Sequence, residues 1–268
     1  MAVLAIDTSA AVAVSLCDDD GALLAARSVD SARQHAELLA PMIRDVLAEA
    51  GLTAGDVSAV VVGTGPAPFT GLRAGLVTAR VFALARSIPL YGVPSLDALA
   101  AEALTSGEFV SPAPVRESTP TNSRTSHELG GAAAGVEVVA VGDARRREVY
   151  AARYRGVGAA GAADDRGAAV PATGADGGDL EVELVAGPVV EHPDELAELV
   201  RGAVVVGRGA QAYPEAFPGA RAPFVPDPAV LARLAISRAR RGVEQPSEPL
   251  YLRRPDAVPA SARKRATG

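Results

Sequence analysis

The chain has 268 residues, of which 49% are hydrophobic and only 4% are aromatic, and its formal net charge is −6. This amount of apolar material can form the core of one large domain or two small ones. The negative charge and the scarcity of aromatic side chains argue against a protein that wraps nucleic acid, which needs clustered positive charge and stacking surfaces.

The first part of the chain alternates between strand and helix patterns. The predicted elements are strands at 3–9, 11–18 and 22–29, a helix within 31–52, a strand at 57–63, a helix at 72–87, a strand at 88–93 and a helix at 95–104. The sequence DDDG at 18–21 predicts a hairpin turn, and Gly51 a helix end. This order predicts a mixed sheet covered by helices. It resembles the ribonuclease H-like half-domain of actin, sugar kinases and Hsp70.

The second part begins after a segment rich in Ser, Thr, Pro and Gly. The residue pattern of this second part predicts a hairpin over 136–154, then a strand, a helix, a strand and a final helix. The fold class is therefore α/β, with two ribonuclease H-like subdomains. We expect an N-terminal domain at 1–104, a flexible insertion at 105–135, and a smaller actin-like C-terminal domain at 136–268 with a low-complexity insertion at 156–179 and a basic tail from Arg238.

Cysteine content and hydropathy bear on the cellular environment. Cys17 is the only cysteine, so no disulfide can form within the chain, and its strand-like surroundings predict a small core residue. No apolar run reaches the roughly 18 residues of a membrane span, and the first residues lack the basic region of a signal peptide. We expect a soluble, cytoplasmic protein without membrane contacts.

The most unusual segment is GTGPAPFTGLRAGL at 63–76. A phosphate-binding Walker A loop needs a lysine, and the only lysine in the chain is Lys264. The dinucleotide pattern GxGxxG is also absent, because Ala67 and Pro68 stand in its last two positions. Pro66 and Pro68 remove backbone N–H donors that a phosphate cradle would use. The segment therefore predicts a rigid turn leading into a helix.

The turn and the helix after it have two further features, and the second is open to two interpretations. Phe69 is expected at the loop tip and Thr70 at the helix cap, as Ser95 is for the later helix. The small residues of the helix, among them Gly75 and Ala79, allow another helix to approach closely. That other helix could belong to this chain or to a partner.

Catalytic and metal-binding patterns are sparse. The three histidines lack HxxxH or HExxH spacing, and no GxSxG nucleophile elbow is present. Asp7, Thr8 and Ser9 follow the first strand, where sugar kinases and Hsp70 relatives carry residues that meet metal-bound phosphates. Turn chemistry alone also explains these residue types. We interpret them as relic phosphate-loop positions, and expect no catalytic residue, no bound metal and no cofactor of its own.

Six segments together suggest a family. They are AIDTS at the start, RQHAELLAPMI at 33–43, VGTGPAPFTGLRAGL at 62–76, GVPSLDALA at 92–100, DARRREVYAARY at 143–154 and PLYLRRPDA at 249–257. The chain resembles the TsaB family, also called YeaZ, of tRNA threonylcarbamoyladenosine biosynthesis proteins. Ala67-Pro68 replaces the Gly-Ser of the family's loop, and Ala36 replaces a more usual serine.

The resemblance implies a non-catalytic accessory subunit that binds and activates the transferase TsaD, which modifies the adenosine next to the tRNA anticodon. The TsaE ATPase would join this complex, so ATP would be used by the complex, and tRNA would be met indirectly. Without TsaD the chain could form a homodimer. The partner-binding residues implied are Phe69, Thr70, Gly71, Leu72, Arg73, Gly75, Leu76, Ala79, His35 and Leu39.

Other functions remain open at this stage. A small-molecule kinase of the same fold would use Asp7 and a second phosphate loop, for which VGRGAQAY at 206–213 is a candidate. A self-associating scaffold would use the small-residue helix. A glycoprotease-type peptidase is not supported by the histidine pattern.

Overall fold

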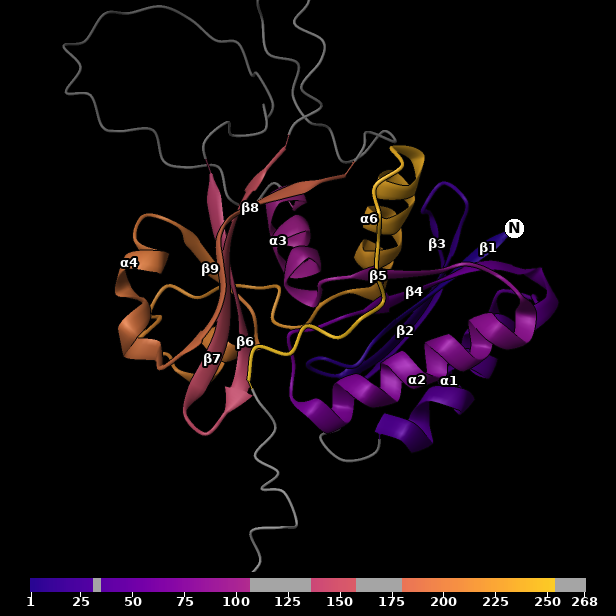
Figure 1. The fold of residues 1–268 in the computed structure, drawn as a ribbon, viewed down its shortest axis with the longest axis horizontal. Helices are drawn as coiled ribbons and strands as arrows, with labels where there is room; N and C mark the ends of the chain where they lie inside the picture. Colours follow the sequence, from indigo (N-terminus) through magenta and orange to yellow (C-terminus); the bar gives the residue numbers. More distant parts are fainter. Residues whose placement is uncertain (31–34, 107–135, 158–179, 254–268) are drawn as a thin grey trace, which may run out of the picture.

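The computed structural model describes residues 1–30, 35–106, 136–157 and 180–253, which form two sheets with helices on both sides of each (Figure 1). The two predicted insertions, at 105–135 and 156–179, lie almost entirely outside these residues, as does the end of the chain beyond 253. The α/β class predicted from the sequence is confirmed.

The first sheet has five strands in the order β3-β2-β1-β4-β5. They are β1 (Ala2–Asp7), β2 (Val12–Asp18), β3 (Leu23–Val29), β4 (Val57–Gly63) and β5 (Leu90–Val93). The first three are antiparallel neighbours, whereas β4 and β5 run parallel to β1. The β2–β3 turn falls where DDDG predicts it, and Gly21 adopts a φ of 88° there.

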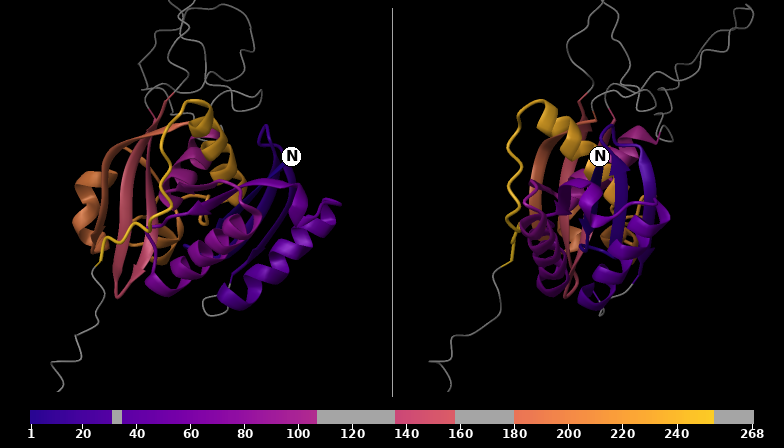
Figure 2. Two further views of the ribbon diagram at one scale, coloured as in Figure 1. Left: turned by 45° about the vertical axis from the view of Figure 1, so that its right-hand side comes forward. Right: turned by 90° about the vertical axis from the view of Figure 1, so that its right-hand side faces the viewer.

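Two long helices, α1 (His35–Glu49) and α2 (Phe69–Arg86), cover the outer face of this sheet side by side (Figures 1 and 2). Their buried side chains share a core with β1, β2 and β4. Gly51, with a φ of 66°, ends α1 as predicted, and a short 3-10 helix η1 (Ala54–Asp56) leads into β4. Both outer helices are therefore anchored on one sheet.

The second sheet has four strands in the order β8-β7-β6-β9. They are β6 (Glu137–Arg145), β7 (Glu148–Gly156), β8 (Val182–Glu191) and β9 (Val204–Val206). This order and the strand directions repeat those of β3-β2-β1-β4. The short helices η2 (Pro193–Leu196), α4 (Ala197–Val200) and α5 (Arg208–Ala212) follow β8 and β9. The second half is thus a smaller copy of the first in topology.

Helices α3 (Ser95–Thr105) and α6 (Pro228–Arg240) lie between the two sheets (Figure 1). Each packs mainly on the sheet of the opposite half: α3 on β6 and β7, and α6 on β1 and β2. Arg238 of α6 forms ion pairs of 2.8 Å with Asp97 of α3 and with Glu181. Tyr154 of β7 donates a 2.9 Å hydrogen bond to Asp97. This largely buried network joins the two halves.

The structure corrects three details of the sequence analysis. Ser95 and Thr70 do not cap their helices, because the caps are Pro94 and Pro68, without a side-chain hydrogen bond. The Ser95 hydroxyl is instead bonded to Asp7. Arg238, expected to begin a basic tail, lies inside α6 with its charge paired.

Residues 243–253, which we call the C-terminal strap, run in an extended conformation along β5 and α2. Gly92 of β5 donates to the carbonyl of Gln245 (3.0 Å), and Leu250 donates to Thr64 (2.9 Å). A Cβ at Gly92 would lie 2.1 Å from the carbonyl oxygen of Pro246, so only glycine permits this approach. The strap covers the otherwise open edge of the first sheet.

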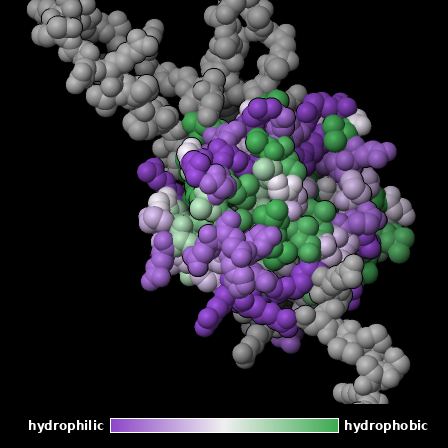
Figure 3. Space-filling model, turned by 60° about the vertical axis from the view of Figure 1, so that its left-hand side comes forward, coloured by the Kyte–Doolittle hydropathy of each residue, from purple (hydrophilic) through white to green (hydrophobic). Residues whose placement is uncertain are grey.

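The surface is mixed in character. Figure 3 shows hydrophobic side chains gathered in the middle of one face and surrounded by hydrophilic ones. Isolated apolar residues are normal on a protein surface. Among the described residues, no helix is long and apolar enough to cross a membrane.

One half-buried acid, Glu102, makes the stability of the protein dependent on pH. Glu102 of α3 has a carboxylate oxygen with no hydrogen-bond partner among the described residues. Burial, reinforced by the Asp227 carboxylate, raises the pKa of Glu102 to about 7. The folded state thus holds this proton more tightly than the unfolded chain, and the ionised form destabilises the fold as pH rises from about 4.5 to above 7.

Glu102→Gln is therefore expected to stabilise the protein at pH 8 by on the order of 1–2 kcal/mol, after allowance for partial exposure. The gain should vanish at about pH 3.5, below the unfolded-state pKa of 4.5, where the wild-type carboxyl is protonated in both states. Urea unfolding at the two pH values measures this difference. Glu195→Gln makes the same change at an exposed position, and an equal pH-dependent gain there would contradict the assignment.

Candidate functional site

The cleft between the two halves begins with Asp7, at the end of β1. This side chain is 1% exposed. Its Oδ1 accepts hydrogen bonds from the Ser9 amide (2.8 Å) and the Ser9 hydroxyl (2.6 Å), and its Oδ2 accepts one from the Ser95 hydroxyl (2.6 Å). Burial raises the pKa of Asp7, although the Ser9 and Ser95 hydrogen bonds oppose that rise. The carboxyl is therefore occupied by local partners.

The loop from Gly63 to Pro68, which we call the glycine loop, packs around the Asp7 carboxyl. A Cβ at Gly63 would lie 1.9 Å from Asp7 Oδ2 and 2.8 Å from Ser95 Oγ. Gly65, at a φ of 87°, turns the chain so that its carbonyl accepts from the Ser95 amide at 2.7 Å. The turn predicted from the sequence is confirmed, and the close contacts with Asp7 and Ser95 explain why glycine stands at position 63.

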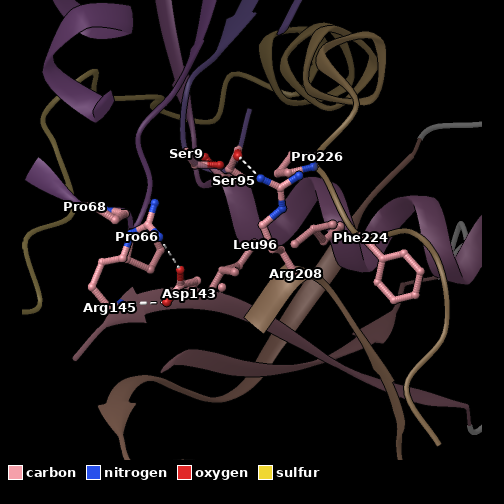
Figure 4. Close-up of a pocket in the computed structure, with 13 residues that line it drawn as sticks. Ser9, Pro66, Pro68, Ser95, Leu96, Asp143, Arg145, Arg208, Phe224 and Pro226 are labelled. Atoms are coloured by element: carbon pink, nitrogen blue, oxygen red, sulfur yellow. Dashed lines mark hydrogen bonds and ion pairs between the residues drawn. The ribbon is translucent and has the colours of Figure 1, made fainter. Parts of the chain in front are cut away.

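Arg208 closes the cleft from the other half (Figure 4). It lies at the start of α5 and donates to the carbonyl of Ala10 (2.7 Å) and to both carboxylate oxygens of Asp30 (2.9 and 2.8 Å). The cleft between these groups has a volume of about 170 Å³. Its lining residues are Ser9, Ala10, Pro66, Pro68, Ser95, Leu96, Leu99, Gly142, Asp143, Arg145, Arg208, Phe224 and Pro226.

These residues do not fit the nucleotide and metal ion that actin-like folds commonly hold. Pockets for such ligands have volumes of roughly 300–1,000 Å³, well above the 170 Å³ found here. Asp7 already uses both oxygens. Within the described ranges, no group of three His, Cys, Asp or Glu side chains is placed to bind a metal ion.

A second candidate site is an apolar groove between α1 and α2, with a volume of about 760 Å³. Its lining residues are Ala40, Ile43, Arg44, Leu47, Ala48, Leu52, Thr53, Ala54, Val77, Thr78, Val81, Phe82 and Ala85. Val77, Val81 and Leu84 of α2 are 58%, 60% and 81% exposed. Exposed apolar side chains that recur along one helix beside an apolar groove are typical of a protein-binding surface.

Nine of the ten residues predicted to bind a partner divide into two groups by exposure. Six are buried in the chain's own core: Leu39, Gly71, Leu72, Gly75, Leu76 and Ala79. They support α1 and α2 from within. Phe69, Thr70 and Arg73 are exposed at the start of α2, outside the groove. His35 begins α1.

The exposed apolar residues of α2 were not predicted from the sequence, although their spacing carries a signal. Val77, Val81 and Leu84 recur at i, i+4 and i+7, which places them on one helix face. The buried Leu72, Leu76 and Ala79 follow a separate stripe. A helix with two apolar stripes has one more than its own core can bury.

Comparisons with known proteins show which proteins this chain resembles in sequence and in fold. An uncharacterized protein of Mycobacterium tuberculosis is 36% identical over 263 residues, covering 96% of this chain and 94% of that one. The Escherichia coli tRNA threonylcarbamoyladenosine biosynthesis protein TsaB is 28% identical over 215 residues, covering 80% and 74%. The solved structure of YeaZ from Pseudomonas aeruginosa is 27% identical, covers 94% and 99% of the two chains, and superposes with a TM-score of 0.66.

The chain belongs to the TsaB (YeaZ) family. A second match is informative for this TsaB-family protein. The family model for TsaD, the tRNA N6-adenosine threonylcarbamoyltransferase, matches residues 29–115. That range contains α1, β4, α2, β5 and α3. The helices that line the apolar groove therefore lie in the segment that TsaB and TsaD have in common.

The contact between Gly63 and Asp7 can be tested directly. Gly63→Ala places a methyl group where the Asp7 carboxylate lies, so we expect destabilisation of roughly 2–4 kcal/mol in chemical unfolding. Gly219→Ala is the matched control, because nothing lies within 4 Å of the added carbon, and it should change stability by less than about 0.5 kcal/mol. Equal stability of the two variants would show that the loop can move away from Asp7.

Proposed function

We propose that this TsaB-family protein is an accessory subunit in the synthesis of threonylcarbamoyladenosine on tRNA, and that it works by binding and activating a TsaD-type transferase. Family membership supports the pathway. The apolar groove between α1 and α2 supports the binding role, because the exposed side chains of Val77 and Val81 line it. This groove is the observation that carries the proposal.

The choice of partner follows from the shared segment. Because the TsaD family model matches residues 29–115, a TsaD-type protein has its own counterparts of α1 and α2. Two proteins with related helix pairs can pack them against each other in a nearly two-fold arrangement, as identical subunits do in a dimer. The same reasoning predicts that a second copy of this chain occupies the groove when TsaD is absent.

The buried residues named from the sequence have a supporting role in this proposal. Gly75 lies against Thr8, since a Cβ there would meet the Thr8 hydroxyl at 2.4 Å. Thr8 in turn donates to the carbonyl of Gly71 at 2.9 Å. These contacts fix α2 against the end of β1, so that Val77 and Val81 are presented on a rigid helix. Preorganised surfaces bind more tightly because less freedom is lost.

The chemistry of the complex is assigned to its other members. In this proposal Asp7 has no metal to bind, since its oxygens are held by Ser9 and Ser95. ATP is used by a TsaE-type ATPase that joins the complex, and the transferase acts on the tRNA. The contribution of this chain is the surface that holds the transferase in its active form.

Val81→Asp is expected to weaken binding of the TsaD-type protein about 30-fold or more, because it places a charge on an exposed side chain that lines the apolar groove. Threonylcarbamoyladenosine formation should fall in parallel. The assay combines this chain with TsaC, TsaD, TsaE, threonine, bicarbonate, ATP and an unmodified ANN-decoding tRNA, followed by mass spectrometry of the nucleosides. Calorimetry measures binding.

Val185→Asp is the matched control, since Val185 lies on β8 and is 42% exposed. It should leave both binding and modification unchanged. Nucleoside yield that does not depend on this chain at all would refute the accessory role. Normal TsaD binding by Val81→Asp would instead refute the groove as the docking surface.

A further inference from the structure

Two of the sequence segments that identify the family, 62–76 and 249–257, meet at the end of the C-terminal strap. Phe69 and Arg73 come from the glycine loop and α2, and Tyr251 comes from the strap. The Phe69 and Tyr251 rings lie 5.1 Å apart between centroids. The Arg73 guanidinium lies 3.4 Å from the centre of the Phe69 ring, and its Nε donates to the Tyr251 hydroxyl at 2.9 Å. We call these three residues the aromatic–arginine cluster.

The cluster is unusual in a chain with so few aromatic residues. Phe69 is 38% exposed and Tyr251 is 40% exposed, and they are the only aromatic side chains among the large, strongly exposed hydrophobic residues of the described ranges. Arg73 is also exposed, and its hydrogen-bond partner is a neutral phenol. Within the described residues it forms no ion pair with an acid. An uncompensated positive charge therefore lies against two accessible rings.

More arginines lie close to this cluster. Two residues beyond Tyr251, Arg253 donates to the carbonyl of Ala144 (3.3 Å) and forms an ion pair with Glu148. Two extended residues span at most about 7 Å, so the strap brings the cluster next to the β6–β7 turn. Figure 4 shows Arg145 of that turn beside Pro66, in the loop that leads to Phe69.

The β6–β7 turn holds its arginines in a fixed and strained conformation. Arg145, Arg146 and Arg147 have φ values of 62°, 56° and 64°, a region that non-glycine residues seldom occupy. Strained backbone of this kind persists at functional sites more often than elsewhere. Arg73, Arg145, Arg146, Arg147 and Arg253 thus lie around the cluster and turn, where Arg145 is paired with Asp143 and Arg253 with Glu148.

We propose that this surface binds single-stranded RNA, with an unpaired base stacked on the rings of the aromatic–arginine cluster and the phosphates held by Arg73 and by the arginines of the β6–β7 turn (145–147). Exposed aromatic rings beside arginines are the means by which proteins hold unpaired bases. A duplex keeps its bases stacked, so rings of this kind have no base face to contact in it. The inference rests on the proposed function: it gives the chain its own contact with the tRNA that the complex modifies.

The test measures binding of the full chain to a fluorescent, unmodified ANN-decoding tRNA. Tyr251→Leu removes the ring but keeps an apolar side chain, and it should weaken binding about 5- to 100-fold. Arg73→Ala should lower the slope of log Kd against log salt by about 0.7, the value of one single-strand phosphate contact. Arg201→Ala removes an exposed arginine from the far side of the second sheet, and it should leave both quantities unchanged.

The outcomes separate this inference from the proposed function. If Tyr251→Leu and Arg73→Ala bind tRNA like the wild type, the RNA site is refuted, whether or not the chain still activates TsaD. If the two variants lose TsaD binding instead, the cluster is a protein contact and the inference also fails. Reduced RNA binding with normal TsaD binding supports it. Val81→Asp should show the reverse pattern, with tRNA binding by the isolated chain intact.

Discussion

The buried ion pairs of Arg238 are the interaction on which the rest of the structure depends. Arg238 belongs to α6, which packs on the first sheet, and its partner Asp97 belongs to α3, which packs on the second. Because the two helices are exchanged between the halves, their contact fixes both sheets at once. Removing one partner of such a pair leaves a buried charge unpaired, which typically costs 3–5 kcal/mol. Tyr154 and Glu181 complete the network.

The fixed arrangement of the two halves limits the space in the cleft between them. Actin-like proteins that hydrolyse nucleotides need room between their halves, whereas here Arg208 spans the gap to Ala10 and Asp30. Asp30 directly precedes the segment that leads to α1, and Pro68 directly precedes α2. Helix α2 therefore starts from a wall of the cleft, which Pro68 lines. In our proposal, a cleft held shut keeps the docking surface in one conformation.

The strands and helices were predictable from the sequence because their patterns are local. The alternation of strands and helices up to 104, and the helix end at Gly51, were confirmed because they depend on residues close in sequence. The role of Ser95 was not predictable, since its bond to Asp7 joins residues 88 positions apart. A serine at a helix start normally caps it, and here the distant carboxyl competes successfully for the hydroxyl.

The candidate site was predictable only in part, for a related reason. Small residues of α2 indicated close packing, but sequence alone did not say whether they faced the core or a partner. The structure places Gly75 against Thr8, inside the chain. The apolar residues left outside, such as Val77 and Val81, could have been recognised by counting a second stripe on the helix. One stripe of α2 faces the first sheet, including β1, which is distant in the sequence, and is therefore buried. The other stripe faces outward and stays exposed.

The arrangement of residues along α2 also explains how one short loop can position two separate surfaces. The loop from Gly63 to Pro68 is fixed on its inner side by Asp7 and Ser95. Beyond it, the first turn of α2 directs Phe69 and Arg73 toward the strap, while Val77 and Val81, two and three turns further along, line the groove. A helix of 18 residues is about 27 Å long, enough for its start to meet RNA while its middle meets a protein. The rigid turn sets the position of both surfaces, so an RNA bound at one end and a transferase bound along the side would be held in a constant relative position.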